Sequence, residues 1–205
     1  MWRLGKYHAA TKDGVDLLFI GDSITDGWTR TGKAVWKKYY GGFRVANFGV
    51  GGDRTQNVLW RLKQGMVDGL HPKVVVLLVG TNNIGDRNTP EETSRGVTAV
   101  LRDLRTRLLD SKFILMAIFP RGSEPDNPQR KQVNAINAAI AKLEDGDVVR
   151  FIDISGRFLD AKGMIRRDLL PDTVHPSARG YEIWAEALHG PLAEMLGPPA
   201  SSPDF

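Results

Sequence analysis

One serine lies where a nucleophile would be useful. Residues 17–26 read LLFIGDSITD, an apolar run that ends in Gly-Asp-Ser at Ser23. Such a run is typical of a buried parallel strand that leads into a helix. Ligands bind outside the carboxyl ends of the strands in open α/β sheets, so Ser23 is placed to attack an electrophile. This chemistry is nucleophilic catalysis, for which the serine needs a base.

One of the 4 histidines has the surroundings of a general base. His175 follows Asp172 by three residues, between the fifth apolar run and the last expected helix. A carboxylate at this spacing folds back in a turn and holds the imidazole Nδ1–H, which leaves Nε2 free as the base. Asp-x-x-His alone is a common chance occurrence. Its value comes from a loop that should return to the carboxyl edge, where Ser23 lies.

Two other loops offer hydrogen-bond donors for an oxyanion. Residues 47–53 (NFGVGGD) place three glycines after the second apolar run, and Asn82 and Asn83 follow the third. A glycine lets a backbone N–H approach a developing oxyanion, and an amide side chain donates to it equally well. Taken alone, the glycines are better explained as turn residues. The two asparagines are as well explained as caps.

The elements that must position these residues are short apolar runs alternating with helical stretches. The expected strands are residues 16–20, 44–48, 74–79, 113–119 and 148–152. Helical periodicity marks residues 97–108, 133–143 and 181–188, and Thr89-Pro90-Glu91-Glu92 predicts a capping box before the first of these helices. This alternation predicts an α/β fold, a three-layer α/β/α sandwich around a five-stranded parallel sheet. The expected loops at the carboxyl edge are residues 49–53, 80–89 and 120–128.

Composition is that of a globular protein and excludes several kinds of site. The 205 residues include 41% hydrophobic and 25% charged residues, which predicts one domain over residues 1–197 and a flexible tail over 198–205. The net charge is +4, and acidic residues are interspersed among the basic ones. The sequence therefore predicts a mixed-charge surface and no nucleic-acid partner. The chain has 0 cysteines, which excludes disulfides, thiol nucleophiles and Cys-based zinc sites.

The sequence leaves the cellular compartment open. No apolar run reaches the roughly 18 residues that a membrane span needs, so no membrane span is expected. The first residues lack the apolar stretch of a signal peptide. The protein is therefore expected in the cytoplasm, or in a secreted or periplasmic location where a signal has been removed.

Four motifs, in order and each after an expected strand, resemble the motif blocks of the SGNH (GDSL) hydrolases over nearly the whole chain. They are Gly21-Asp22-Ser23-Ile24-Thr25, Gly52 in GVGGD, Asn82 in GTNN, and the Asp172–His175 pair. The resemblance implies a flavodoxin-like SGNH fold and a triad of Ser23, His175 and Asp172. It implies an oxyanion hole made by the N–H groups of Ser23 and Gly52 and by the Asn82 side chain. It implies no metal and no organic cofactor.

Within that family, the chain resembles the catalytic α subunits of platelet-activating-factor acetylhydrolase and related bacterial carbohydrate acetylesterases. Residues 47–62, 80–83 and 119–122 carry this likeness. A Gly-x-Ser-x-Gly elbow is absent because Thr25 takes its last position, which argues against a standard α/β-hydrolase. The resemblance implies hydrolysis of a small acyl ester, with acetyl expected, on a carbohydrate or related alcohol. It also implies a homodimer.

Two alternatives to acetyl ester hydrolysis stay open. A longer-chain esterase, thioesterase or lysophospholipase-like enzyme would use the same triad. A non-catalytic binding module would use the fold alone, and it is disfavoured because all five catalytic positions are filled. Further candidates for substrate contact are Asp22, Thr81 as a wall of the acyl pocket, and Trp28 and Arg121 beside the alcohol. For Trp28 and Arg121, packing and a solvated charge are the favoured interpretations.

Overall fold

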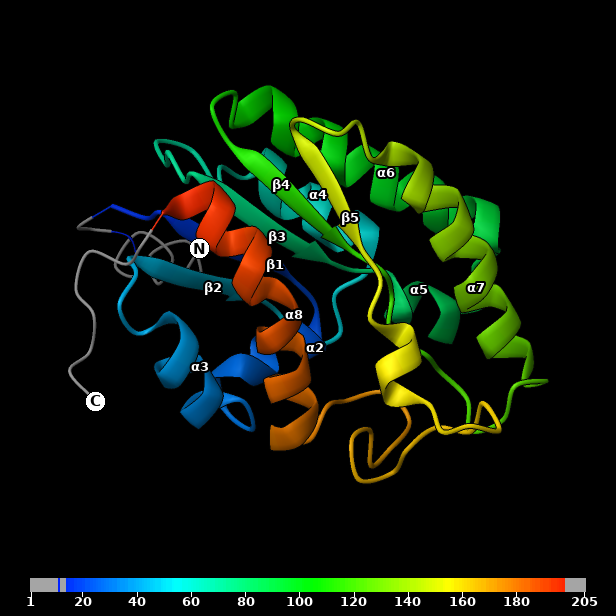
Figure 1. The fold of residues 1–205 in the computed structure, drawn as a ribbon. Helices are drawn as coiled ribbons and strands as arrows, with labels where there is room; N and C mark the ends of the chain where they lie inside the picture. Colours follow the sequence, from blue (N-terminus) through cyan, green and yellow to red (C-terminus); the bar gives the residue numbers. More distant parts are fainter. Residues whose placement is uncertain (1–10, 12–13, 198–205) are drawn as a thin grey trace.

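A five-stranded parallel sheet forms the centre of the molecule (Figure 1). The computed structural model describes residue 11 and residues 14–197; the predicted tail and the first ten residues lie outside this part. The strands are β1 (Leu17–Gly21), β2 (Val45–Gly49), β3 (Val74–Leu78), β4 (Lys112–Met116) and β5 (Val149–Ile152). Their order in space is β2-β1-β3-β4-β5, the flavodoxin-like order. The predicted fold is confirmed.

Helices cover both faces of the sheet. On one face lie α4 (Thr55–Lys63), α6 (Pro90–Arg107) and α7 (Pro128–Ile140), and on the other lie α2 (Ser23–Asp26), α3 (Lys33–Tyr40) and α8 (Ala178–Leu196). Successive strand residues point to opposite faces, so Ile20 packs under the first group and Phe19 under the second. Because both faces are buried, the strands read as continuous apolar runs.

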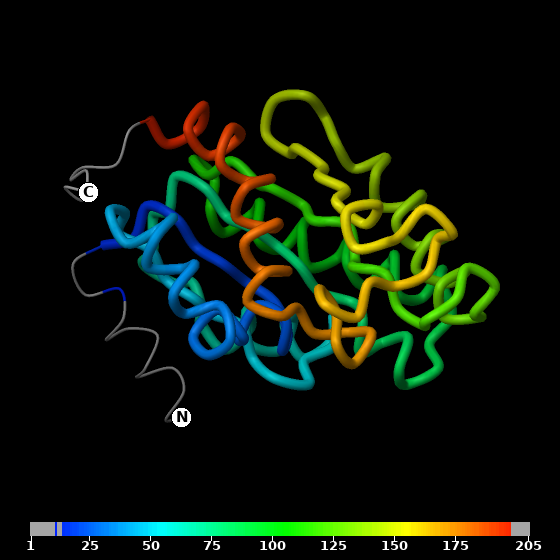
Figure 2. Tube along the Cα trace, turned by 60° about the horizontal axis from the view of Figure 1, so that its bottom comes forward, coloured from blue at the N-terminus to red at the C-terminus, as the bar shows by residue number. Residues whose placement is uncertain are grey.

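The parallel register brings the functional loops to one edge. Gly21 at the end of β1 lies opposite Gly49 of β2 and Leu78 of β3. The chain leaves β1 toward β2 on one side and returns to β3 on the other, so the edge beyond Gly21 is a topological switch point. Figure 2 turns the bottom of Figure 1 forward and shows the segment that precedes α8, in orange, near the same edge.

The observed strands overlap the five predicted strands, the predicted helical positions fall mainly in α6, α7 and α8, and the structure adds α2, α3 and α4 and corrects one loop. The predicted capping box is present, with the Thr89 N–H donating to Glu92 at 2.9 Å and the Glu92 N–H to Thr89 Oγ1 at 3.2 Å. Residues 80–89, expected as a loop, contain the short helix α5 (Thr81–Gly85). Five residues are too few to show a helical period in sequence. The described residues also form three single-turn helices, which are η1 (Gly27–Thr29), η2 (Ala141–Leu143) and η3 (Ser155–Phe158).

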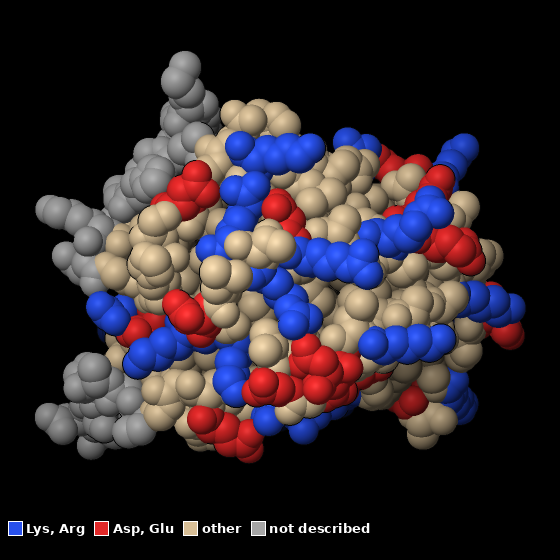
Figure 3. Space-filling view, turned by 90° about the horizontal axis from the view of Figure 1, so that it is seen from above, with Lys and Arg blue, Asp and Glu red and all other residues tan. Residues whose placement is uncertain are grey.

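The surface carries mixed charges. Figure 3 shows basic and acidic side chains interspersed over the upper face of the molecule. Many of the charges form exposed ion pairs, such as Arg150–Glu194 at 2.7 Å and Arg105–Asp145 at 3.2 Å. Among the described residues, none of the helices combines the length and apolar character that crossing a bilayer requires.

Candidate active site

Three side chains from two distant parts of the chain form one hydrogen-bonded series. Ser23 is the first residue of α2, directly after β1, and its Oγ lies 2.9 Å from Nε2 of His175. Nδ1 of the same imidazole lies 2.6 Å from Oδ2 of Asp172. A carboxylate only accepts hydrogen bonds, so the shared proton is on Nδ1 and Nε2 is free to accept from the Ser23 hydroxyl. The structure thus brings together the predicted nucleophile, base and carboxylate.

A tight turn before α8 orients the imidazole. Oδ1 of Asp172 accepts the N–H groups of Val174 at 3.0 Å and His175 at 2.7 Å. Between Asp172 and Val174, Thr173 has a φ of 68°, in the left-handed region that β-branched residues rarely adopt. Its N–H donates to the Leu170 carbonyl at 3.0 Å, which holds the turn. Strain of this kind is stored where the surroundings fix the chain, here beside the base.

The charge on Asp172 is stabilised by the same turn. Partial burial raises the pKa of the Asp172 carboxyl, but hydrogen bonds from the His175 N–H, the His175 imidazole and the Val174 N–H outweigh it, so the pKa is lowered overall. The group is therefore a carboxylate at neutral pH, as an acceptor for Nδ1–H must be.

The loop after β2 presents Gly52 in a conformation that suits glycine. Its φ is 80°, its surface is exposed, and a Cβ added there would meet nothing within 4 Å. The turn is closed by the Asp53 N–H, which donates to the Val50 carbonyl at 3.1 Å. The Val50 N–H donates to the Gly21 carbonyl at 3.1 Å, which ties this loop to the end of β1 beside the nucleophile. Glycine is required here by the backbone rather than by lack of space.

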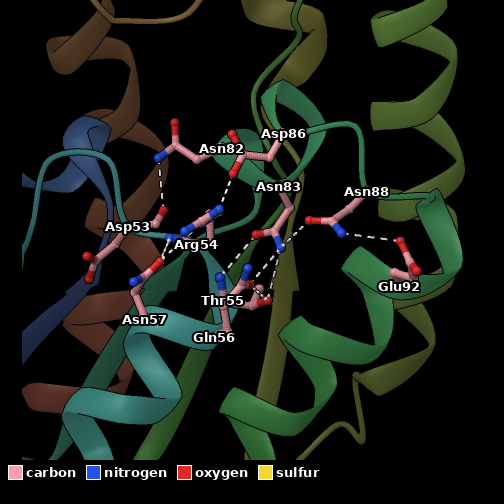
Figure 4. Close-up of polar contacts among 10 residues, drawn as sticks. All are labelled: Asp53, Arg54, Thr55, Gln56, Asn57, Asn82, Asn83, Asp86, Asn88 and Glu92. Atoms are coloured by element: carbon pink, nitrogen blue, oxygen red, sulfur yellow. Dashed lines mark hydrogen bonds and ion pairs between the residues drawn. The ribbon is translucent and has the colours of Figure 1, made fainter.

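The two neighbouring asparagines of α5 do different things (Figure 4). Asn82 is half-buried, and its Nδ2 donates to the Asp53 carbonyl at 2.9 Å. A side-chain amide has two N–H donors, so one remains for a ligand. Asn83 is buried; its Oδ1 accepts the Thr55 N–H at 3.0 Å, and its Nδ2 donates to Asn88 Oδ1 at 3.2 Å. Residue type alone does not distinguish the two asparagines, the family resemblance implies Asn82, and Asn82 is the less buried of the two.

The further candidates for substrate contact lie deeper than expected. Trp28 has no exposed surface; its ring packs 4.5 Å from that of Tyr181 and 5.0 Å from that of Trp184. It therefore does not reach a substrate in this structure, and the packing interpretation describes it. Thr81 is buried, and its carbonyl and Oγ1 accept hydrogen bonds from Arg121 at 3.0 Å and 3.1 Å. Arg121 thus braces α5, and substrate contact by either residue stays a prediction.

Asp22 is buried directly beside the nucleophile. Its side chain is the N-cap of α2, with Oδ1 accepting the Ile24 N–H at 3.0 Å, while Oδ2 is buried without a hydrogen bond. Burial raises the pKa of the Asp22 carboxyl to about 7, against the lowering effects of the Ile24 N–H and His175 and with a further rise from Asp53. At only 1% exposure, direct contact between Asp22 and a substrate also stays a prediction.

The Asp22 carboxyl makes a testable contribution to the pH dependence of stability. Its pKa is 3.8 in a free chain and about 7 in the fold, so between these values the folded state holds a proton that the unfolded state has released. The free energy of unfolding therefore falls as pH rises through this window, by up to about 1.4 kcal/mol for each pH unit. Asp22→Asn keeps the capping oxygen and removes the titration. Relative to the parent, the variant is expected to gain roughly 2–4 kcal/mol between pH 4 and pH 8.

Urea unfolding at several pH values measures this difference. Asp110→Asn, the same change at an exposed carboxylate, supplies the background for the loss of one negative charge. Parallel stability curves for the parent and Asp22→Asn would show that Asp22 is ionised across the whole range.

Comparison with known proteins agrees with the geometry of this edge. The family model of the GDSL-like lipase/acylhydrolase family matches residues 19–183, a stretch that runs from β1 into α8 and includes all three side chains of the hydrogen-bonded series. The chain belongs to this family. It is a carboxylic ester hydrolase, and the resemblance to the SGNH (GDSL) hydrolases is confirmed.

Curated relatives of this GDSL-family chain include acetylhydrolases. The alpha2 subunit of platelet-activating factor acetylhydrolase IB from Rattus norvegicus is 35% identical over 185 residues, covering 88% of this chain and 77% of the relative. The alpha1 subunit from Homo sapiens is 33% identical over 182 residues, with 88% and 77% covered. At this identity and coverage the family assignment is secure, while the alcohol of the substrate is left open.

Solved structures share the fold of this family member. A GDSL-like lipase from Bacteroides thetaiotaomicron superposes with a TM-score of 0.76 at 19% identity, covering 95% of this chain and 98% of the other. An acetylxylan esterase from Geobacillus stearothermophilus gives a TM-score of 0.69 at 21% identity, with 93% and 98% covered. The helix-flanked parallel sheet is thus a known scaffold of GDSL hydrolases.

Proposed function

We propose that this GDSL hydrolase removes acetyl groups from oxygen esters through an acyl-enzyme on Ser23. The observation that carries the proposal is the unbroken series from Ser23 Oγ to His175 Nε2 at 2.9 Å and from His175 Nδ1 to Asp172 Oδ2 at 2.6 Å. Nucleophile, base and orienting carboxylate are the three parts of this kind of acyl transfer. They stand at the edge of the sheet where a ligand has access.

In the acylation step, His175 Nε2 takes the hydroxyl proton as Ser23 Oγ attacks the ester carbonyl. Asp172 stabilises the imidazolium that forms, and its turn holds the ring in place. The imidazolium then returns the proton to the departing alcohol, so the ester C–O bond breaks and an acetyl-serine remains. Water activated by the same nitrogen attacks this intermediate and releases acetate.

The negative oxygen of each tetrahedral intermediate would be held by three donors. The N–H of Ser23, in the first turn of α2, has no acceptor within the helix. The N–H of Gly52, in the loop after β2, and the second N–H of Asn82, on α5, are held near one another by the Asn82–Asp53 hydrogen bond. Donors that are held in place before the reaction stabilise the developing charge without reorganisation.

The names of the relatives indicate the acyl group of the substrate more clearly than its alcohol. Relatives named as platelet-activating factor acetylhydrolase subunits and a structural neighbour named as an acetylxylan esterase differ in the alcohol, and their names share an acetyl group. We therefore propose an acetyl ester of a carbohydrate or related alcohol as the substrate. The homodimer implied by the resemblance is a further part of the proposal, and light scattering of the purified chain tests it.

A chain-length series tests the proposed acyl preference. The value of kcat/KM for p-nitrophenyl acetate is expected to exceed that for p-nitrophenyl octanoate by about tenfold or more. The proposed acyl pocket accepts a small group, and one methylene in such a pocket is worth about 1–3 kcal/mol of discrimination against the longer chain. Acetate release from acetylated xylan and from platelet-activating factor, measured side by side, then identifies the alcohol. Faster cleavage of octanoate would favour the longer-chain esterase or thioesterase instead.

A further inference from the structure

We propose that Arg61 is a positioning residue that sets the geometry of the oxyanion hole; this inference rests on the proposed function. Arg61 lies on α4, in the layer behind the site, and is only 6% exposed. Arginine is rarely buried without a specific set of partners. Its polar partners here are backbone carbonyls near the ends of β1 and β2 and the carboxylate of Asp53.

The guanidinium binds the ends of two strands and one carboxylate. Its Nη1 donates to the Phe48 carbonyl, near the end of β2, at 2.9 Å. Its Nη2 lies 2.7 Å from Oδ2 of Asp53 and 3.4 Å from the Gly21 carbonyl at the end of β1. The planar fork of an arginine can serve such divergent acceptors at one time, whereas a lysine ammonium acts as a point charge.

The direction of α4 explains how a residue near its carboxyl end reaches the site. This helix begins at Thr55, immediately after the loop that carries Gly52. Side chains on a helix lean toward its amino terminus. Arg61 therefore extends back toward the carboxyl edge of the sheet, and Met66 Sδ lies 2.8 Å from its Nη1. The Arg61 guanidinium is therefore buried beside the loop that carries Gly52 and Asp53.

Asp53 links Arg61 to Gly52 and Asn82, two of the proposed oxyanion donors. Its carboxylate pairs with Arg61, and its carbonyl accepts the Asn82 amide at 2.9 Å. In Figure 4 this carbonyl faces Asn82, while the carboxylate points away from it. Asp53 also follows Gly52 directly, so a shift of Asp53 moves both donors together. A misplacement of about 1 Å at such a site costs as much as about a hundredfold in rate.

Gly21 links Arg61 to the nucleophile Ser23. Its carbonyl accepts both the Arg61 guanidinium and the Val50 N–H, and it precedes Ser23 by two residues. Arg61 therefore contacts the end of β1 and the loop after β2 directly, and it is linked to Asn82 on α5 through the Asp53 carbonyl.

Two substitutions test the role of this guanidinium. In Arg61→Met the stem is kept and the head group lost; in Arg61→Lys the charge is kept and the fork lost. Both are expected to lower kcat for p-nitrophenyl acetate, Met by about tenfold to thirtyfold and Lys by less, with KM changed by less than about twofold. Assays are run well below the unfolding temperature of each variant, with circular dichroism to confirm folding.

A core truncation controls for loss of stability. Leu104→Ala, on α6 over the same face of the sheet, removes a fully buried side chain that lies outside the proposed site. It is expected to unfold at a lower temperature and to retain the parent kcat. If the two Arg61 variants retain the parent kcat while folded, Arg61 is structural only and the inference is wrong.

A double-mutant cycle asks whether Arg61 acts through the oxyanion hole. In an Asn82→Ala background, Arg61→Met is expected to lower kcat by a smaller factor than in the parent, because one of the donors that it positions is gone. The same factor in both backgrounds would overturn the inference. Failure of the proposed function can be distinguished from failure of this inference. If the proposed function is wrong, the parent chain itself shows no Ser23-dependent hydrolysis of acetate esters.

Discussion

Ser23→Ala is expected to lower kcat for p-nitrophenyl acetate by about 10⁴-fold or more while leaving the fold intact. The change removes only Oγ, whose partner is the His175 imidazole at 2.9 Å. The N–H of residue 23, Gly52 and Asn82 stay in place, so a small residual rate above buffer is expected from these donors. The loss should appear in kcat and in kcat/KM alike, because the removed group acts in the transition state.

Ser94→Ala is the matched control for this loss. Ser94 lies on α6, where its Oγ donates to the Glu91 carbonyl at 3.2 Å, and the same atom is removed from a serine outside the site. This variant should keep the parent activity. Full activity in Ser23→Ala would refute the proposed mechanism. Absence of labelling of the parent protein by a serine-directed organophosphorus reagent would favour a non-catalytic binding module.

The fold and the nucleophile–base pair could be predicted because local signals carry them. Strands buried on both faces must be apolar throughout, so their runs stand out from the amphipathic helices. The edge rule for parallel sheets then placed Ser23 and His175 together, although 152 residues separate them. The structure supplies the distances that join them.

Residues whose roles depend on distant backbone groups could not be recognised in this way. In sequence, Arg61 is an ordinary basic residue near the end of a helix, yet its acceptors lie 13 and 40 residues away, at Phe48 and Gly21. The burial of Asp22 and the division of work between Asn82 and Asn83 likewise arise from packing. The resemblance to the GTNN motif singled out Asn82, but it gave no role for Asn83, whose partners Thr55 and Asn88 are brought together only by the fold.

Asn82→Ala is expected to lower kcat by about 10²–10³-fold with little change in KM, the usual cost of one side-chain oxyanion donor. The removed amide binds more strongly to the tetrahedral oxyanion than to the neutral ester, so its loss falls on the transition state. The variant also loses the hydrogen bond to the Asp53 carbonyl. Asn82→Asp, which accepts hydrogen bonds and brings a negative charge, should be slower still.

Asn83→Ala separates the donor role of Asn82 from general damage to α5. Asn83 is buried and binds Thr55 and Asn88, so its loss should lower the free energy of unfolding by about 1–3 kcal/mol, more than the loss of Asn82. Its effect on kcat should be smaller than that of Asn82→Ala, because the Asn83 amide forms its hydrogen bonds with other protein groups. If Asn82→Ala keeps the parent kcat, the proposed oxyanion hole consists of the backbone N–H groups of Ser23 and Gly52 alone. The Asn82–Asp53 hydrogen bond would then serve only to join α5 to the loop after β2.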